Sequence, residues 1–125
     1  MWLRPGLPQT GVESMKWYQN LYAGKTYQKD IRKIIHQVES GKTVPDLRLI
    51  LLRCDIDNHQ LEIVSQDFLE KYFTDREALL IIGIASGEAE AMELLVQITD
   101  TVYRRAGTAE LRSYFLGETG CFILH

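Results

Sequence analysis

Residues 78–107 read ALLIIGIASGEAEAMELLVQITDTVYRRAG, and this stretch decides the fold class. It opens with an unbroken run of apolar and small residues, which predicts a strand buried on both faces. Ser86 and Gly87 then form a tight turn, and a helix is predicted from there to about Arg105, closed by Gly107. A strand that leads through a small-residue turn into a long capped helix is typical of α/β proteins.

Two further strands are predicted upstream. Residues 47–54 (LRLILLRC) are almost continuously apolar, and residues 61–64 form a shorter apolar run. The connection between them is so short that we expect an antiparallel hairpin. The strand at 78–85 follows 61–64 through a helix that begins at Ser65, so these two strands are expected to run parallel.

A helix is also predicted from Thr26 to about Ser40, because isoleucine and valine recur there at helical spacing and Gly41 stops the pattern. Together these elements predict an α/β (mixed α+β) domain, in which helices pack on a small three- to four-stranded mixed sheet. The domain is expected to span residues 15–125. Residues 1–14 hold all but one of the prolines and are expected to be a flexible N-terminal arm.

Composition limits the classes of function. The chain of 125 residues has 14 basic and 17 acidic side chains and a net charge of −3. Because nucleic-acid-binding domains usually carry a basic excess, this balance argues against nucleic acid. No apolar run approaches the roughly 20 residues of a membrane span, so no membrane association is expected. Cys54 and Cys121 are too few for a disulfide scaffold, and we interpret them as reduced thiols of a cytoplasmic protein.

The turn at Ser86 has the geometry in which a helix N-terminus binds phosphate. Phosphate-binding motifs, however, contain more glycines or a Gly-Lys-Ser/Thr ending, which this chain lacks. Glu88 and Glu90 also place carboxylates where a phosphate would bind, and their charge would repel it. We therefore interpret this turn as a connection stabilised by its own acidic residues.

The segment 54–59 (CDIDNH) gathers a thiol, two carboxylates and an imidazole. It lacks the spacing of a calcium loop or a zinc site, and His59 could act as the base for a Cys54 nucleophile only if the turn folds back, so we predict no catalytic residue, metal or cofactor. A plain hairpin turn is the preferred interpretation. If the carboxyl ends of the strands at 47–54 and 78–85 lie together, a small-molecule or enzyme site there would instead be lined by Cys54, Asp55, Asp57, Ser86 and Gly87.

A basic stripe lies on the predicted helix at 26–40. Lys29, Arg32, Lys33 and His36 lie at helical spacing, opposite the isoleucines, and Lys25 precedes them. The aromatic side chains of residues 17–27 are close in sequence, and charge with stacking is the combination that binds single-stranded nucleic acid. The alternative is a solvated helix face beside an aromatic core.

Aromatic residues are dense in 17–27 and 111–122, and they exceed what a small sheet is expected to hide. Apolar segments that pack outside the core often pack on a partner subunit, and the most common assembly of this kind is a symmetric homodimer. Packing within one chain is the alternative.

The pattern from 47 to 115 includes LEI at 61–63, IIGIAxGxAEAxELL at 81–95 and VYR at 102–104. It resembles small proteins of anaerobic Gram-positive bacteria whose function is not established. The resemblance implies a bacterial cytoplasmic protein, and it brings no catalytic residues.

The preferred interpretation is a non-catalytic interaction or accessory domain that self-associates as a dimer. Two alternatives stay open. One is a small-molecule binder or enzyme with a site at the strand carboxyl ends, and the other is a single-stranded nucleic-acid binder that uses the helix face from Lys29 to His36.

Overall fold

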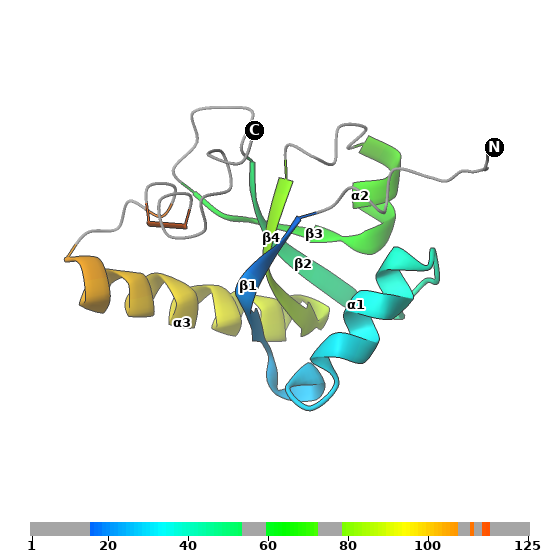
Figure 1. Cartoon of the computed structure of the whole chain (residues 1–125), viewed down its shortest axis with the longest axis horizontal. Helices are drawn as coiled ribbons and strands as arrows, with labels where there is room; N and C mark the ends of the chain where they lie inside the picture. The colour runs from blue at the N-terminus through cyan, green and yellow to red at the C-terminus, as the bar shows by residue number, and fades with distance from the viewer. Residues whose placement is uncertain (1–15, 54–59, 73–78, 108–110, 112–113, 116–125) are drawn as a thin grey trace.

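The computed structural model describes residues 16–53, 60–72, 79–107, 111, 114 and 115. In chain order the elements are β1 (Lys16–Ala23), the 3-10 helix η3 (Lys25–Tyr27), α1 (Ile31–Glu39), β2 (Leu47–Arg53), β3 (Glu62–Ser65), α2 (Gln66–Tyr72), β4 (Leu79–Ser86) and α3 (Gly87–Ala106). They form one four-stranded mixed sheet between two helical layers (Figure 1). The predicted α/β class and mixed sheet are confirmed. The predicted arm at 1–14 lies outside the described residues.

The strands lie in the order β1-β4-β2-β3. β2 pairs antiparallel with β3, with Leu49 opposite Val64, as expected of the predicted hairpin. β2 also pairs antiparallel with β4. β3 and β4 therefore run in the same direction, as predicted, but β2 lies between them. Neighbour order depends on the whole sheet, so the local pattern could not indicate this insertion.

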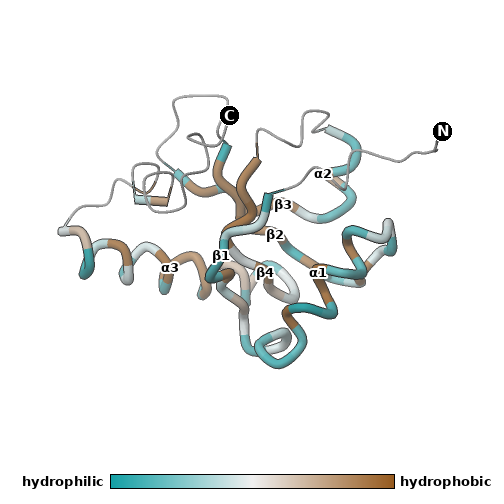
Figure 2. The backbone as a smooth tube through the Cα atoms, viewed as in Figure 1, coloured by the Kyte–Doolittle hydropathy of each residue, from teal (hydrophilic) through white to brown (hydrophobic). Residues whose placement is uncertain are grey.

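The centre of β2, residues 49–52, is apolar because helices cover both of its faces. Leu49 and Leu51 pack in the cluster that includes residues of η3, α1 and α2, whereas Ile50 and Leu52 pack in the cluster on the α3 side. This alternation is the two-residue period of a strand. Figure 2 shows the consequence, with apolar strands at the centre and polar residues on the outer surface of α1.

α3 is the longest helix and covers one face of the sheet (Figure 1). Its buried residues are Ala91, Leu94, Ile98 and Val102, at the spacing of one helix face. Gly107 ends the helix in the left-handed conformation at φ 71°, and its N–H donates to the Tyr103 carbonyl at 2.8 Å. Among the described helices, none combines the length and apolar character that crossing a membrane requires.

The sequence pattern did not predict β1, which forms one edge of the sheet. It pairs parallel with β4, and its register shifts between Trp17 and Tyr22. Tyr18 is buried in the core, where its ring meets Phe115 edge-on at 4.9 Å between centroids. Tyr27 is buried as well. In this part of the aromatic segment, packing within one chain is therefore the interpretation that the structure supports.

The helix predicted from Thr26 begins later, as α1 at Ile31. Residues 25–27 form the 3-10 helix η3 instead, closed by a hydrogen bond from Tyr27 N–H to the Gly24 carbonyl at 3.0 Å. The Thr26 hydroxyl donates to Glu90 on α3 at 2.8 Å, so it does not cap the helix. A contact across 64 residues of sequence thus overrides the local capping pattern.

α2 buries only one of its sides. Leu69 is buried, but Phe68 and Tyr72 are exposed, and their rings lie 4.6 Å apart between centroids. α2 packs on β2 and on the short edge strand β3. An edge strand offers less covering surface than a central one, so only one side of α2 is buried.

Candidate functional site

The N-terminus of α3 is neutralised by a carboxylate of the helix itself. Glu90 Oε2 accepts the Ser86 backbone N–H at 2.9 Å, and Oε1 accepts the Thr26 hydroxyl at 2.8 Å. Partial burial acts to raise the pKa of Glu90, but these hydrogen bonds and the nearby Lys25 charge hold that pKa below its usual range. A charged Glu90 therefore takes the place that a bound phosphate would occupy at this helix end.

Gly24 makes this arrangement possible. Its N–H donates to the Ile84 carbonyl at 2.9 Å, which holds the end of β1 against β4. A Cβ atom at Gly24 would run into the Glu90 carboxylate. On the other side of the turn, Gly87 has φ 81° and its N–H donates to the Asp46 carbonyl at 2.7 Å. The backbone groups at this turn are thus used for structure.

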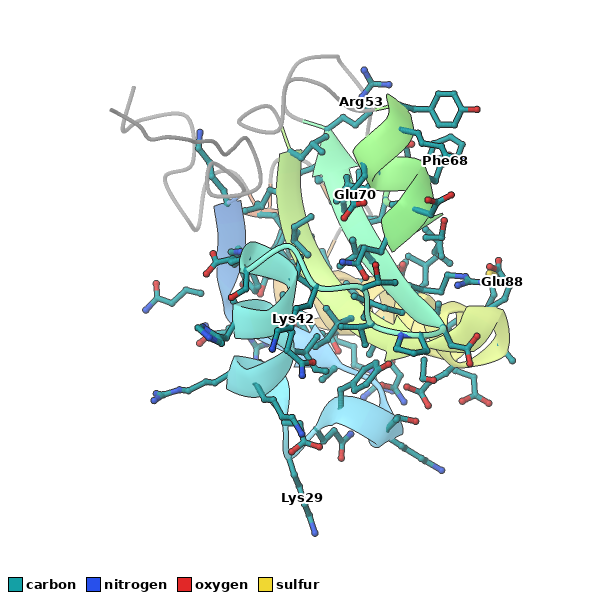
Figure 3. All side chains as sticks on the ribbon, turned by 90° about the vertical axis from the view of Figure 1, so that its right-hand side faces the viewer. Lys29, Lys42, Arg53, Phe68, Glu70 and Glu88 are labelled. Atoms are coloured by element: carbon teal, nitrogen blue, oxygen red, sulfur yellow. The ribbon has the colours of Figure 1, made fainter. Side chains whose placement is uncertain are left out.

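The structure does not bring together the two strand ends on which the predicted ligand site depended. β2 and β4 are antiparallel, so Ser86 pairs with Leu47 at the start of β2, whereas Arg53 at its end pairs with Leu79. Figure 3 shows this separation, with Arg53 at one end of the sheet and Glu88, just after Gly87, toward the other. Of the five candidate residues, Ser86 and Gly87 lie in the turn described above. The other three, Cys54, Asp55 and Asp57, fall outside the described residues.

The basic residues of α1 and of the segment just before it form an exposed surface, which we call the α1 basic surface. Arg32, Lys33 and His36 lie on α1, Lys25 lies in η3 and Lys29 in the turn between them, and all five are exposed. Ile34 and Val38 are buried on the opposite side of the helix. Figure 3 shows Lys29 pointing away from the body of the molecule. The predicted placement of charge opposite the apolar stripe is correct for this helix.

The aromatic side chains expected beside this surface pack within the protein instead. Tyr18 and Tyr27 are buried. Trp17 is half-buried, and its Nε1–H donates to Glu39 at 3.0 Å. The basic side chains of the predicted nucleic-acid face are therefore exposed, but most of the aromatic rings expected beside them are packed inside the protein and cannot stack on bases.

A second surface, which sequence reasoning missed, runs along α3. We call it the α3 stripe, and it consists of Met92, Leu95, Val96, Thr99 and Tyr103. Met92, Val96 and Tyr103 are 48%, 65% and 59% exposed. Leu95 is half-buried and packs against the core. A shallow groove of about 510 Å³ is lined by four of these residues and Asp100.

The sequence does hold a signal for the α3 stripe. Met92, Val96, Thr99 and Tyr103 are spaced four, three and four residues apart, which places them along one side of a helix. That side is offset from the core face that the structure buries. A single sheet can cover only one side of a helix, so the second apolar side of α3 remains exposed.

The buried polar side chain described for this chain has a structural role. Gln66 accepts the Val44 N–H at 2.9 Å and donates to the Lys42 carbonyl at 2.7 Å, which anchors the loop before β2.

Within the described residues, no group of three or more histidine, cysteine, aspartate or glutamate side chains is placed to hold a metal ion. No protein-family model matches the chain, and no curated protein or solved structure is significantly similar to it.

Proposed function

We propose that this chain is a non-catalytic interaction domain of the bacterial cytoplasm that self-associates through the α3 stripe. The observation that carries the proposal is the exposure of Met92, Val96 and Tyr103 along one side of the helix. Contiguous apolar surface of this kind marks interaction sites in soluble domains, whereas scattered exposed residues do not.

A second copy of the chain suits this surface because α3 is complementary to itself when antiparallel. Two antiparallel copies oppose the two helix dipoles. The charged side chains near the helix ends are held within the chain, Glu90 by Ser86 and Thr26, and Arg104 by Asp100, so the pairing does not depend on them. A dimer with two-fold symmetry uses the same patch on both subunits, so the α3 stripe alone can form the whole interface.

The spacing of the α3 stripe suggests a register for this pair. If Val96 faces Thr99 of the second copy, then Met92 faces Tyr103 of the second copy, because both pairs are centred between positions 97 and 98. The large side chains at the outer positions would then enclose the smaller ones near the two-fold axis. Apolar residues at intervals of four and three are the pattern by which paired helices interlock.

The proposed contact differs from the one suggested by the sequence. The aromatic lead-in of the chain lies in β1, with Tyr18 in the core, so we assign self-association to the α3 stripe instead. The enzyme alternative has less support, because the strand ends that it required lie apart in the described sheet.

The test is the molar mass in solution, measured by light scattering after size exclusion, for the wild type and two variants. Val96→Glu places a charge in the centre of the α3 stripe and is expected to raise the dissociation constant of the dimer by about 100-fold or more. Gln97→Glu adds the same charge on the same helix, away from the stripe, and is the matched control. A monomeric wild type, or equal loss in both variants, would overturn the proposal.

A further inference from the structure

Positive and negative charges are distributed unevenly along this chain, which the net charge alone does not reveal. Residues 16–42, which form β1, η3, α1 and the turn after it, carry six basic and two acidic side chains, a net charge of +4. Since the whole chain carries −3, the remaining residues together carry −7. An asymmetry of this size between parts of a domain is typical of proteins that bind a charged partner with one face.

Among the described residues, no ion pair joins Lys29, Arg32, Lys33 or His36 to an acidic side chain, whereas Lys25 lies near the Glu90 carboxylate. By contrast, Lys71 on α2 and Arg104 on α3 are paired with the acidic residues four positions before them, at 3.4 and 2.9 Å. Glu39, the acidic residue on α1, accepts the indole N–H of Trp17. The positive potential over α1 is therefore not cancelled by pairing.

The geometry of this surface is a short row. Arg32, Lys33 and His36 lie on one side of α1 within about 6 Å along the helix axis, and Lys29 precedes them by one turn. A row of this length can contact a few successive phosphates of one nucleic-acid strand. The side chains of the row are exposed to solvent rather than enclosed, which suits an extended strand better than a small anion.

We propose that the α1 basic surface binds the phosphate backbone of single-stranded nucleic acid. A flexible strand can follow a short convex row of cations, whereas a stiff duplex would meet it at fewer phosphates. An acidic protein fits less well, because protein interfaces need an apolar centre. The large exposed apolar side chains among the described residues lie on α2 and α3, not on α1.

The kind of binding follows from the residues present. With Tyr18 and Tyr27 buried, base stacking by these rings contributes nothing, and sequence preference is expected to be weak. With three to four phosphate contacts, the slope of log affinity against log salt should be about −2 to −3, at roughly −0.7 per contact.

This inference is independent of self-association. α1 and α3 cover opposite faces of the sheet (Figure 1), so a dimer formed through the α3 stripe leaves both α1 basic surfaces exposed. The Val96→Glu variant should therefore still bind an oligonucleotide that is too short to reach two protomers. Conversely, charge reversal on α1 should leave the dimer mass unchanged.

The experiment is fluorescence anisotropy with a short labelled oligothymidylate, titrated with the full chain from low to moderate salt. The double variant Arg32→Glu, Lys33→Glu is expected to bind about tenfold more weakly or worse, and with a smaller salt slope. The control is Lys71→Glu, Arg104→Glu, which changes the net charge equally on α2 and α3 and should retain binding. A circular dichroism spectrum of each variant verifies that it is folded.

Three results would overturn the inference. The first is absence of wild-type binding at low salt. The second is equal loss in the control variant, which would indicate an effect of total charge rather than of a surface. The third is equal or tighter binding of a duplex or of polyglutamate, which would assign the surface to another kind of polyanion.

Discussion

Glu90 Oε2 lies 2.9 Å from the backbone nitrogen of Ser86, so the carboxylate of α3 satisfies an N–H group where β4 gives way to the helix. The other oxygen of the same carboxylate holds Thr26 of η3. One side chain therefore joins three features of the fold: the end of β4, the first turn of α3 and, from far earlier in the chain, the η3 turn that leads into α1.

Removing this carboxylate should destabilise the domain. Glu90→Ala is expected to lower the free energy of unfolding by about 1 kcal/mol, the usual effect of losing a helix cap. Glu93→Ala is the matched control, because Glu93 is an exposed acidic residue on the same helix. Urea unfolding followed by circular dichroism measures both, and equal losses would contradict the role assigned to Glu90.

The same residue should give the stability a dependence on pH. The folded-state pKa of Glu90 lies below its ordinary value of 4.5, so its ionised form stabilises the fold above that value. Protonation as the pH falls through the folded pKa removes this contribution. The stability difference between wild type and Glu90→Gln should therefore be full near neutral pH and shrink below pH 4.5. A difference that grows toward acid would refute the assigned direction.

Gly24 should tolerate no side chain while Glu90 is in place. Gly24→Ala is expected to cost about 1–3 kcal/mol, because the new Cβ meets the carboxylate of Glu90. The clash has one identified partner, so the double variant Gly24→Ala, Glu90→Ala should be more stable than the sum of the single changes implies. Additive losses in a double-mutant cycle would show that Gly24 is constrained by something other than Glu90.

Gln66 should be more important than an average polar residue. Gln66→Leu leaves the buried Val44 N–H and the Lys42 carbonyl without their partner, which is expected to cost about 1–3 kcal/mol. Gln97→Leu, a change of the same type at an exposed position, should stay within about 0.5 kcal/mol. Thermal unfolding of the two variants measures both losses of stability, and equal losses would contradict the role assigned to Gln66.

The proposed dimer register can be tested by mixing two variants. In a background where both native cysteines are serine, chains with Met92→Cys and chains with Tyr103→Cys should form a disulfide only when mixed. Mixing Met92→Cys with Gln97→Cys is the control, because position 97 lies away from the α3 stripe. Disulfides within either variant alone, or in the control mixture, would rule out the antiparallel register.

The sequence determined the elements whose signals are local. The strand at 79–86, its turn and α3 were predicted closely, since an unbroken apolar run, acidic residues at one helix end and glycine at the other specify them. The hairpin of β2 and β3 followed from their short connection. β1 was missed because it is a bulged edge strand, whose alternation of buried and exposed residues is weak.

Only the tertiary structure decided which predicted groups lie together. The antiparallel pairing of β2 with β4 placed Ser86 beside Leu47 and away from Arg53, so the described carboxyl ends of these two strands do not lie together. The packing of α3 on the sheet leaves Met92, Val96 and Tyr103 exposed, although their sequence pattern resembles that of a core face. The physical reason is the same in both cases: the local pattern fixes the conformation and sidedness of an element, but its neighbours are chosen by the packing of the whole chain.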